Sequence, residues 1–404
     1  MALDLQRSLK TLLLPALLLL AVYMLQQPLS DQLMPLGEIL ARLPYALFIT
    51  GMAFALLFRH SREFFNLLIL LLCVAVLDVA VWSATPHSHS TLIHALLCLL
   101  VPVNLVINDL WQERGILNRY GLQRAAAIAT QLLLAVWVVH SPPGALVDSL
   151  AFTPLPLLAA SPIPALAQLV ILLCSIVLLI YVFTHPAPLQ GTLFIGFISL
   201  VLALHQFDTP ILSRLYLLLS GLLILLALLF NIRQLAYYDE LTRLPSRRSL
   251  RQTLMSQGSR YSLAMVDVDH FKKLNDTHGH DVGDQVLRML AAHLNKVKGG
   301  KAFRYGGEEF TLVFPGKLTD ETRAILEQLR ETIANSPFRV RHKSRPAKRP
   351  EKPRPRSDTP DLSISVSIGV ADTTTADDPQ AIMKRADQAL YQAKKKGRNR
   401  VVAS

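Results

Sequence analysis

The sequence predicts an N-terminal all-α transmembrane bundle over residues 1–232, followed by a C-terminal α+β domain over residues 233–404 with a largely antiparallel sheet. Nearly all of the long leucine-rich runs lie in the first part, while short β-prone runs mix with helical patterns in the second. The chain of 404 residues is 51% hydrophobic, which is too apolar for a wholly soluble protein. Strands and helices that mix around a hairpin favour an α+β sandwich for the second part.

Eight segments of the first part are long and apolar enough to be membrane helices, which need about 20 residues each. They are residues 9–25, 38–58, 64–84, 91–109, 122–140, 164–183, 190–206 and 211–232, of which the seventh is the shortest. Arginines follow the even-numbered segments, as at Arg59, Arg62 and Arg233, whereas acidic residues such as Asp148 lie in the alternate loops. This charge asymmetry predicts that the even-numbered connections and both termini are cytoplasmic.

The first segment has a second interpretation, because a basic start and a leucine run are also typical of a signal peptide. No small-x-small cleavage site follows it, only Gln26-Gln27-Pro28-Leu29. Cleavage would leave seven helices and would still place the C-terminal half in the cytoplasm.

Polar residues inside the predicted helices have two interpretations: interhelical hydrogen bonds or interface positions, and a sensory pocket. They are Asp78, His94, Asn104 and Asp109. A transporter would be indicated by a coupled intramembrane charge pair or an inverted repeat, and we expect neither. The cysteines all lie in apolar runs without metal-ligand spacing, so we interpret them as free thiols: Cys73, Cys98 and Cys174.

The net charge of +12 does not indicate a nucleic-acid partner. Basic residues concentrate in cytoplasmic loops and in one Pro-rich insert, residues 339–357, and no aromatic stacking pattern accompanies them. The insert is either a solvated loop or an electrostatic attachment to the anionic inner leaflet, at about 1 kcal/mol per basic residue near the surface.

The second part divides into regular elements in a fixed order. The last membrane helix continues to about residue 238, and a turn leads to a helix at 247–257. We expect strands at 262–268, 302–305, 310–314 and 363–370, and further helices at 271–275, 282–297, 319–334 and 379–396.

The stretch RYGGEEF, Arg304–Phe310, is the most informative of the chain. Two glycines between β-prone runs predict a two-residue hairpin turn, because glycine adopts positive φ angles at little cost. Gly306 and Gly307 leave the backbone open to a phosphate group. Glu308 and Glu309 add carboxylates beside that opening, which suits a nucleoside triphosphate with Mg²⁺.

A second carboxylate, Asp267, ends an apolar strand at the sheet edge. If its strand neighbours the hairpin, Asp267 and Glu308 face one point, as in sites that hold Mg²⁺ against a triphosphate. Alone, Asp267 would more often cap a strand or helix. The prediction of a metal and triphosphate site therefore rests on Asp267, the glycine pair and Glu308 together, in this order along the chain.

Further polar residues suit a guanine nucleotide. A carboxylate and an amide together match the donors and the acceptor of the guanine edge. The sequence offers Asp284 and Asn275 for this purpose, with His280 between them in the chain. Three cations can meet phosphate oxygens: Lys272, Lys394 and Arg398. The last two could equally form a solvated helix end.

The second part resembles the GGDEF-domain diguanylate cyclases over about residues 237–404. The resemblance rests on DELTRLPSRR (239–248), DVDHFKKLNDTHGHDVGDQVL (267–287), RYGGEEF, SVSIGVA (365–371) and ADQALYQAKKKGRN (386–399). It implies a fold similar to the polymerase palm. It also implies condensation of two GTP into cyclic di-GMP with release of two pyrophosphates, by a pair of domains in a homodimer that uses Mg²⁺ or Mn²⁺.

The resemblance also implies residue roles. Asp267 and Glu308 bind the metal with help from the Val268 carbonyl. Glu308 is also the candidate base for the ribose 3′-hydroxyl, Glu309 completes the signature, and Lys272 stabilises charge in the transition state.

For the substrate, the resemblance implies that Asn275 and Asp284 read guanine with His280 close by. Lys394 and Arg398 hold the terminal phosphates. Cyclic di-GMP effectors downstream are the implied partners.

The chain departs from the family pattern at three places. Arg243 and Ser246 stand where Gly and Asn are usual, which weakens a local turn. Val297-Lys298-Gly299-Gly300 stands where many members carry an Arg-x-x-Asp that binds product, so we predict no product inhibition through this site. Two alternatives stay open: an inactive GTP-binding or scaffold domain, and a transporter or receptor with an accessory soluble domain.

Overall fold

The structure is a computed structural model, and it describes residues 5–82, 87–111, 113–140, 161–185, 188–340, 362–374 and 378–404. The basic insert lies outside these residues from 341 to 361, so its predicted attachment to lipid concerns residues that the structure does not describe. The chain divides into two compact units, Met1–Ile232 and Arg233–Ser404.

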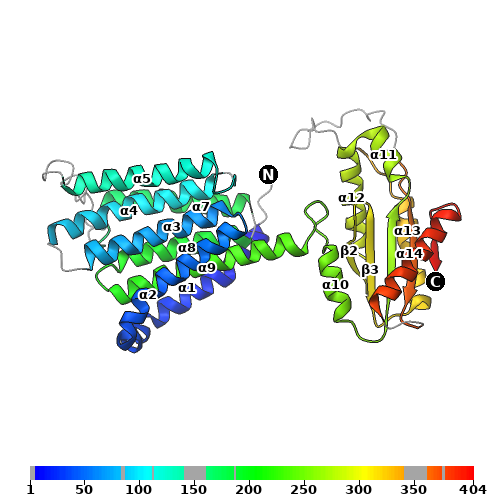
Figure 1. Ribbon diagram of the computed structural model, residues 1–404, viewed down its shortest axis with the longest axis horizontal. Helices are drawn as coiled ribbons and strands as arrows, with labels where there is room; N and C mark the ends of the chain where they lie inside the picture. Colours follow the sequence, from blue (N-terminus) through cyan, green and yellow to red (C-terminus); the bar gives the residue numbers. More distant parts are fainter. Residues whose placement is uncertain are drawn as a thin grey trace. The chain divides into compact units, whose positions relative to one another are not determined.

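The regular elements in the described residues of the first unit are all helices, and several of them run alongside one another in Figure 1. The helices are α1 (Leu5–Leu33), α2 (Gly37–Leu57), α3 (Ser61–Val76), α4 (His87–Leu110), α5 (Arg119–His140), α7 (Ala165–Thr184), α8 (Pro188–His205) and α9 (Pro210–Tyr237). A short 3₁₀ turn, Met34–Leu36, joins α1 to α2, and α3 continues into a π-helical turn, η2 (Leu77–Val81).

Seven of the eight predicted segments each fall on one of these helices, and the third, 64–84, runs from α3 through η2 and ends outside the described residues. Among the described residues, five helices are long and apolar enough to cross a membrane: 34–57, 90–110, 119–138, 165–184 and 210–237. The first and seventh segments correspond to shorter apolar stretches, 11–26 and 190–205.

The polar residues inside the bundle contact other helices. His94 on α4 hydrogen-bonds the Leu204 carbonyl of α8 at 2.8 Å, and the Asn104 amide donates to Gln131 at 2.6 Å. These contacts fit the interpretation as interhelical hydrogen bonds.

The expectation that the helices contain no coupled charge pair is wrong. The Arg214 guanidinium of α9 lies 2.5 Å from the Asp78 carboxylate of η2, and the Tyr45 hydroxyl donates to the same carboxylate at 2.6 Å. The two charges are 136 positions apart in the sequence. Helical periodicity cannot reveal a pairing at that separation.

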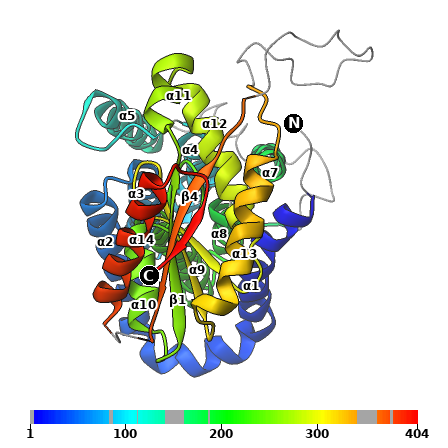
Figure 2. The same ribbon diagram turned by 90° about the vertical axis from the view of Figure 1, so that its right-hand side faces the viewer.

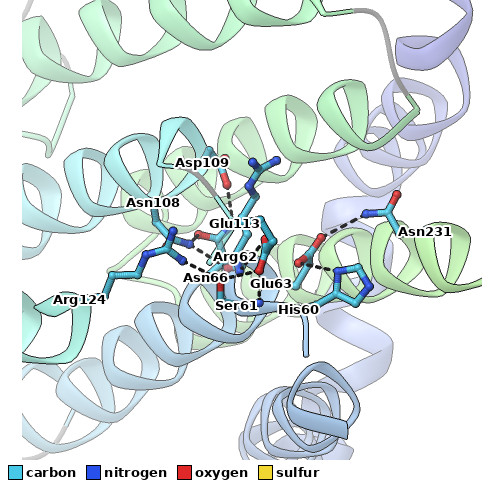
Figure 3. A network of polar contacts seen from close by, with 10 residues as sticks. All are labelled: His60, Ser61, Arg62, Glu63, Asn66, Asn108, Asp109, Glu113, Arg124 and Asn231. Carbon is cyan, nitrogen blue, oxygen red and sulfur yellow. Dashed lines mark hydrogen bonds and ion pairs between the residues drawn. The ribbon is translucent and has the colours of Figure 1, made fainter. Parts of the chain in front are cut away.

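A polar network joins four helices where α3 begins and α4 ends, which Figure 3 shows from close by. We call it the inner polar network; its members are His60, Ser61, Arg62, Glu63, Asn66, Asn108, Asp109, Glu113, Arg124 and Asn231. Asn66 donates to Asp109 at 2.7 Å and accepts from Asn108 at 2.7 Å. Asn231 of α9 donates to buried Glu63 at 3.3 Å, so the network includes the helix that continues into the second unit.

The second unit is built on a five-stranded sheet in the order β2-β3-β1-β4-β5. The strands are β1 (Tyr261–Val268), β2 (Lys301–Arg304), β3 (Glu309–Pro315), β4 (Val366–Asp372) and β5 (Val401–Ala403). β1–β3, β1–β4 and β2–β3 are antiparallel, as predicted, whereas β5 adds to β4 in parallel. The sequence analysis missed β5 because it has only three residues.

Helices cover both faces of this sheet. They are α10 (Arg247–Met255), α11 (Phe271–His278), α12 (His280–Leu294), α13 (Thr319–Ala334) and α14 (Pro379–Lys395). Figure 2 shows α13 and α14 on opposite sides of the strands.

Side-chain alternation along β1 explains the two layers, because successive residues of a strand point to opposite faces. Ala264 and Val266 belong to the core cluster that includes residues of α12 and α13. Leu263 and Met265 belong to the cluster that includes residues of α10 and α14. The next residue in the second series is Asp267, which therefore points toward the α14 side.

Candidate active site

Asp267 lies at the end of β1 and is almost completely buried. The Lys394 ammonium of α14 lies 2.9 Å from its carboxylate; the Asp267 side chain is 5% exposed and the Lys394 side chain is 33% exposed. Burial raises the pKa of Asp267 above its ordinary value, although the charges of Lys394 and Arg398 act to lower it. The packing of the end of α14 against the end of β1 thus brings Lys394 to Asp267, and both were predicted to lie in one site.

Glu308 lies in the connection between β2 and β3, and Asp267 pairs across the sheet with the next residue, Glu309. The prediction that the two strands are neighbours is therefore confirmed. Burial raises the pKa of Glu308, and the negative charge of Asp267 raises it further. The two carboxylates are close enough to interact electrostatically, so a cation between them would be stabilised by both.

The predicted two-residue turn was wrong. Tyr305 to Glu308 connect the strands, and the amides of Tyr305 and Gly306 both donate to the Glu309 carbonyl, at 2.9 and 3.1 Å. Neither Gly306 nor Gly307 has a positive φ angle. A Cβ on Gly306 would lie 2.9 Å from Glu309 Oε2, the end of a flexible side chain, and a Cβ on Gly307 would meet no atom within 4 Å, so space alone does not require glycine at either position.

Arg304 braces this turn, a role that the sequence analysis missed. Its guanidinium donates to the Gly306 carbonyl at 3.1 Å, the Gly307 carbonyl at 2.7 Å and the Asp239 carboxylate at 2.7 Å. Burial acts to raise the pKa of Asp239, but hydrogen bonds from Thr242 and Arg304 outweigh it, and the pKa is lowered. A fixed donor fork matches this arrangement of acceptors, which lysine cannot reproduce.

The turn that carries Asp239 also binds β2 through the main chain. The Arg304 amide donates to the Pro245 carbonyl at 2.9 Å, and the Ser246 amide donates to the Tyr237 carbonyl at 2.8 Å. Arg243, one of the residues that depart from the expected family pattern, has a left-handed backbone with φ 60°. The suspected weakness of this turn therefore has a physical cause, since a side chain disfavours that conformation.

Asn275 lies on α11 against the first turn of α12. Its side-chain oxygen is buried and lacks a hydrogen-bond partner. An added Cβ on Gly283 would lie 1.9 Å from that oxygen, so any side chain at position 283 would clash with the Asn275 amide. A buried acceptor without a partner is costly unless a ligand satisfies it.

The other predicted substrate residues lie on the same two helices. Asp284 is half-buried one position beyond Gly283, His280 is exposed at the start of α12, and Lys272 is exposed on α11. The cations Lys394 and Arg398 lie near Asp267, at and just beyond the end of α14. A cavity of about 620 Å³ is lined by Glu309, Tyr391 and Lys394 among others.

The donor set of this site can be compared with what a divalent ion requires. Within the ranges that the structure describes, no three His, Cys, Asp or Glu side chains gather as a metal-binding group. Mg²⁺ is usually bound by one or two carboxylates together with substrate phosphates and water. Burial raises the pKa values of both Asp267 and Glu308, and the charge of Asp267 raises the pKa of Glu308 further, so the two carboxylates fit that kind of site.

Comparison with known proteins places this site in a family. A family model described as "Diguanylate cyclase, GGDEF domain" matches residues 236–400. Response regulator PleD from Caulobacter vibrioides is 38% identical over 179 residues, 42% of this chain and 36% of PleD. Diguanylate cyclase VdcA from Vibrio cholerae is 37% identical over 179 residues, 43% of this chain and 49% of VdcA. Residues 236–400 are thus a GGDEF domain with diguanylate cyclase homologues.

Among solved structures, the coiled coil and GGDEF domain of DgcB from Caulobacter crescentus, in complex with c-di-GMP, shares 33% identity with this chain. The match covers 44% of this chain and 90% of that chain, with a TM-score of 0.38. The chain spans less than half of the length of PleD and VdcA.

Proposed function

We propose that this protein is a diguanylate cyclase that condenses two GTP into cyclic di-GMP and releases two pyrophosphates. The observation that carries the proposal is the meeting of Asp267, Glu308 and Lys394 at one end of β1 and β3, in a domain whose homologues are diguanylate cyclases. The alternative of an inactive GTP-binding or scaffold domain is weaker, because the acidic and basic groups of the site are all present.

Two carboxylates and one carbonyl would hold Mg²⁺ or Mn²⁺: those of Asp267 and Glu308, and the carbonyl of Val268, with Glu309 beside them. When bound, the ion supplies positive charge at the α-phosphate. Lys394 contacts Asp267 at 2.9 Å and would exchange that contact for phosphate oxygens when substrate and metal enter.

Glu308 would take the proton of the ribose 3′-hydroxyl, whose oxygen then forms a bond to the α-phosphorus of the opposing GTP as pyrophosphate leaves. Its raised pKa supports this role, because a base is most effective when its pKa approaches the working pH. Positioning carries most of the remaining rate, with Lys272 and Arg398 stabilising phosphate charge.

Asn275 and Asp284 would read the guanine edge, with His280 nearby. The unpartnered Asn275 oxygen supports this, since it can accept from a guanine N–H group. Gly306 and Gly307 would let the phosphates approach the backbone. Each domain provides one GTP, so the reaction needs two domains facing each other in a homodimer.

The first unit would anchor the enzyme in the bacterial inner membrane and regulate it. The exposed leucines of helices such as α7 support burial in lipid. α9 runs without interruption from Pro210 to Tyr237, and Asn231 in its last turns is bonded to Glu63. Two residues beyond α9, Asp239 is bonded to Arg304, which braces the Gly306–Gly307 turn. A change in the bundle would therefore reach the catalytic turn through one helix and one ion pair.

The test is product formation from labelled GTP and Mg²⁺ by the full-length protein in detergent. We expect cyclic di-GMP from the wild type and none from Glu308→Ala, while Glu240→Ala, an exposed glutamate outside the site, stays active. Equal product from Glu308→Ala and the wild type would contradict the proposed role of this carboxylate.

A further inference from the structure

Asp269 lies one residue beyond β1 and has no part in the site described so far. Its Oδ1 accepts from the Ser367 hydroxyl at 2.6 Å, and its Oδ2 accepts from the Ser365 hydroxyl at 2.7 Å. The Asn399 main-chain amide also donates to Oδ2, at 3.0 Å. Both oxygens are therefore engaged by the protein, so this carboxylate holds other groups in place.

The segment held by the third of these bonds has an unusual backbone. Gly397, Arg398 and Asn399 follow one another with φ angles of 104°, 63° and 45°. Such conformations disfavour side chains and persist where the surroundings hold them, often at ligand-binding segments. We call residues 397–400 the C-terminal loop of the site.

Other contacts attach the C-terminal loop at its two ends. The Arg398 amide donates to the Ala393 carbonyl of α14 at 3.0 Å, and the Arg400 carbonyl accepts from the Ile368 amide of β4 at 2.9 Å. Arg330 of α13 donates to the Asn399 side chain at 3.1 Å. The bond from the Asn399 amide to Asp269 joins the middle of the loop to the segment that directly follows β1, the strand that carries Asp267.

The C-terminal loop begins beside the active site. It follows α14, whose Lys394 lies 2.9 Å from the Asp267 carboxylate, and the Arg398 amide is bonded to Ala393, the residue before that lysine. The Arg398 charge also acts to lower the pKa of Asp267. Arg398 is only half exposed, although its neighbours Gly397 and Asn399 are exposed.

We propose that Asp269 is a positioning residue, which holds residues 397–400 in the left-handed conformation that places Arg398 to bind the terminal phosphates of GTP. The inference rests on the proposed function, because Arg398 has this role only in a triphosphate site. Asp269 would contact neither substrate nor metal and would act only through the C-terminal loop.

The test compares Asp269→Asn with the wild type in the full-length protein. The asparagine presents an amide N–H group to one of the three donors, so one of these bonds is lost. We expect hydrogen exchange of peptides covering residues 396–401 to become at least tenfold faster, without a change in peptides of β1. This readout requires no ligand, and unchanged exchange in the loop would overturn the inference while leaving the proposed function untouched.

The second readout is binding of GTP and of GMP, both with Mg²⁺. Asp269→Asn should weaken GTP about tenfold and leave GMP unchanged, because only the terminal phosphates lose their cation. KM for GTP should rise by the same factor, with kcat less affected. Arg398→Ala should give the same defect, and the double variant should be no worse than either single variant.

Two results would contradict the proposal: equal weakening of GTP and GMP, or additive defects in the double variant. If Asp269→Asn does not fold, Ser365→Ala replaces it, since that change removes one hydroxyl and keeps the Asn399 bond. It should weaken GTP selectively by about threefold. A wild type that binds GMP but gains no affinity from the terminal phosphates would refute both this inference and the proposed role of Arg398.

Discussion

Replacing Arg304 with lysine tests whether the guanidinium holds the catalytic turn. The side chain is 14% exposed and donates to one carboxylate and two carbonyls. A lysine can keep the contact with Asp239 but not the bonds to Gly306 and Gly307. Each lost bond is worth about 1 kcal/mol net, so we expect the domain to lose about 2 kcal/mol.

This loss corresponds to a fall in Tm of roughly 4–8 °C for a domain of this size. Tryptophan fluorescence would not detect it, because the three tryptophans, Trp82, Trp111 and Trp137, all lie in the first unit. The assay is therefore circular dichroism of residues 233–404, with hydrogen exchange of the 304–310 peptide in the full-length protein.

If the whole loss appears in the transition state, turnover falls up to roughly 30-fold. The matched control is Arg251→Lys, an exposed arginine on α10, which should leave Tm, exchange and turnover unchanged. Wild-type values for Arg304→Lys in all three measurements would refute the bracing role.

Three further predictions concern stability, pH and inhibition. Arg243→Gly should stabilise residues 233–404 by about 0.5–1 kcal/mol, since the left-handed cost is removed and glycine entropy offsets part of the gain; a lower Tm would contradict this. The raised pKa of Glu308 means that its ionised form costs stability above that pKa, and the cost disappears below the ordinary value of 4.5. Glu308→Gln should therefore stabilise the metal-free domain at neutral pH but not at pH 4, which melting curves at the two pH values would show. In the wild type, turnover should already decrease at a pH above 4.5 when the pH is lowered from neutral, because Glu308 becomes protonated there. Cyclic di-GMP at micromolar concentration should not inhibit competitively, because Val297 and Gly300 stand in place of the Arg and Asp that bind product in many family members. A Cβ on Gly300 would also lie 2.7 Å from the Phe314 ring, so an aspartate at this position would be strained. Clear competitive inhibition in a steady-state assay would count against this.

The sequence predicts well what depends on local periodicity. The alternation of β1 and the apolar stripes of α12, α13 and α14 follow from residues a few positions apart. The closeness of Asp267 and Glu308 also follows, once the hairpin is assumed to pair with β1.

What the sequence does not predict depends on partners distant in the chain or on backbone geometry. Arg304 and Asp239 are 65 positions apart, and Asp269 and Asn399 are 130 apart. Charged and polar residues at such separations have many possible partners, and only the fold selects one. The Gly306–Gly307 turn was mispredicted because the strands are joined by four residues, 305–308, in which neither glycine has a positive φ angle.

The central claim is that residues 233–404 contain the whole catalytic site and that pairing two copies makes it active. The most direct measurement fuses these residues to a dimerisation segment and follows labelled GTP with Mg²⁺. We predict cyclic di-GMP from the forced dimer and almost none from the same residues as a monomer. An inactive forced dimer beside an active full-length protein, or a monomer as active as the dimer, would contradict the claim.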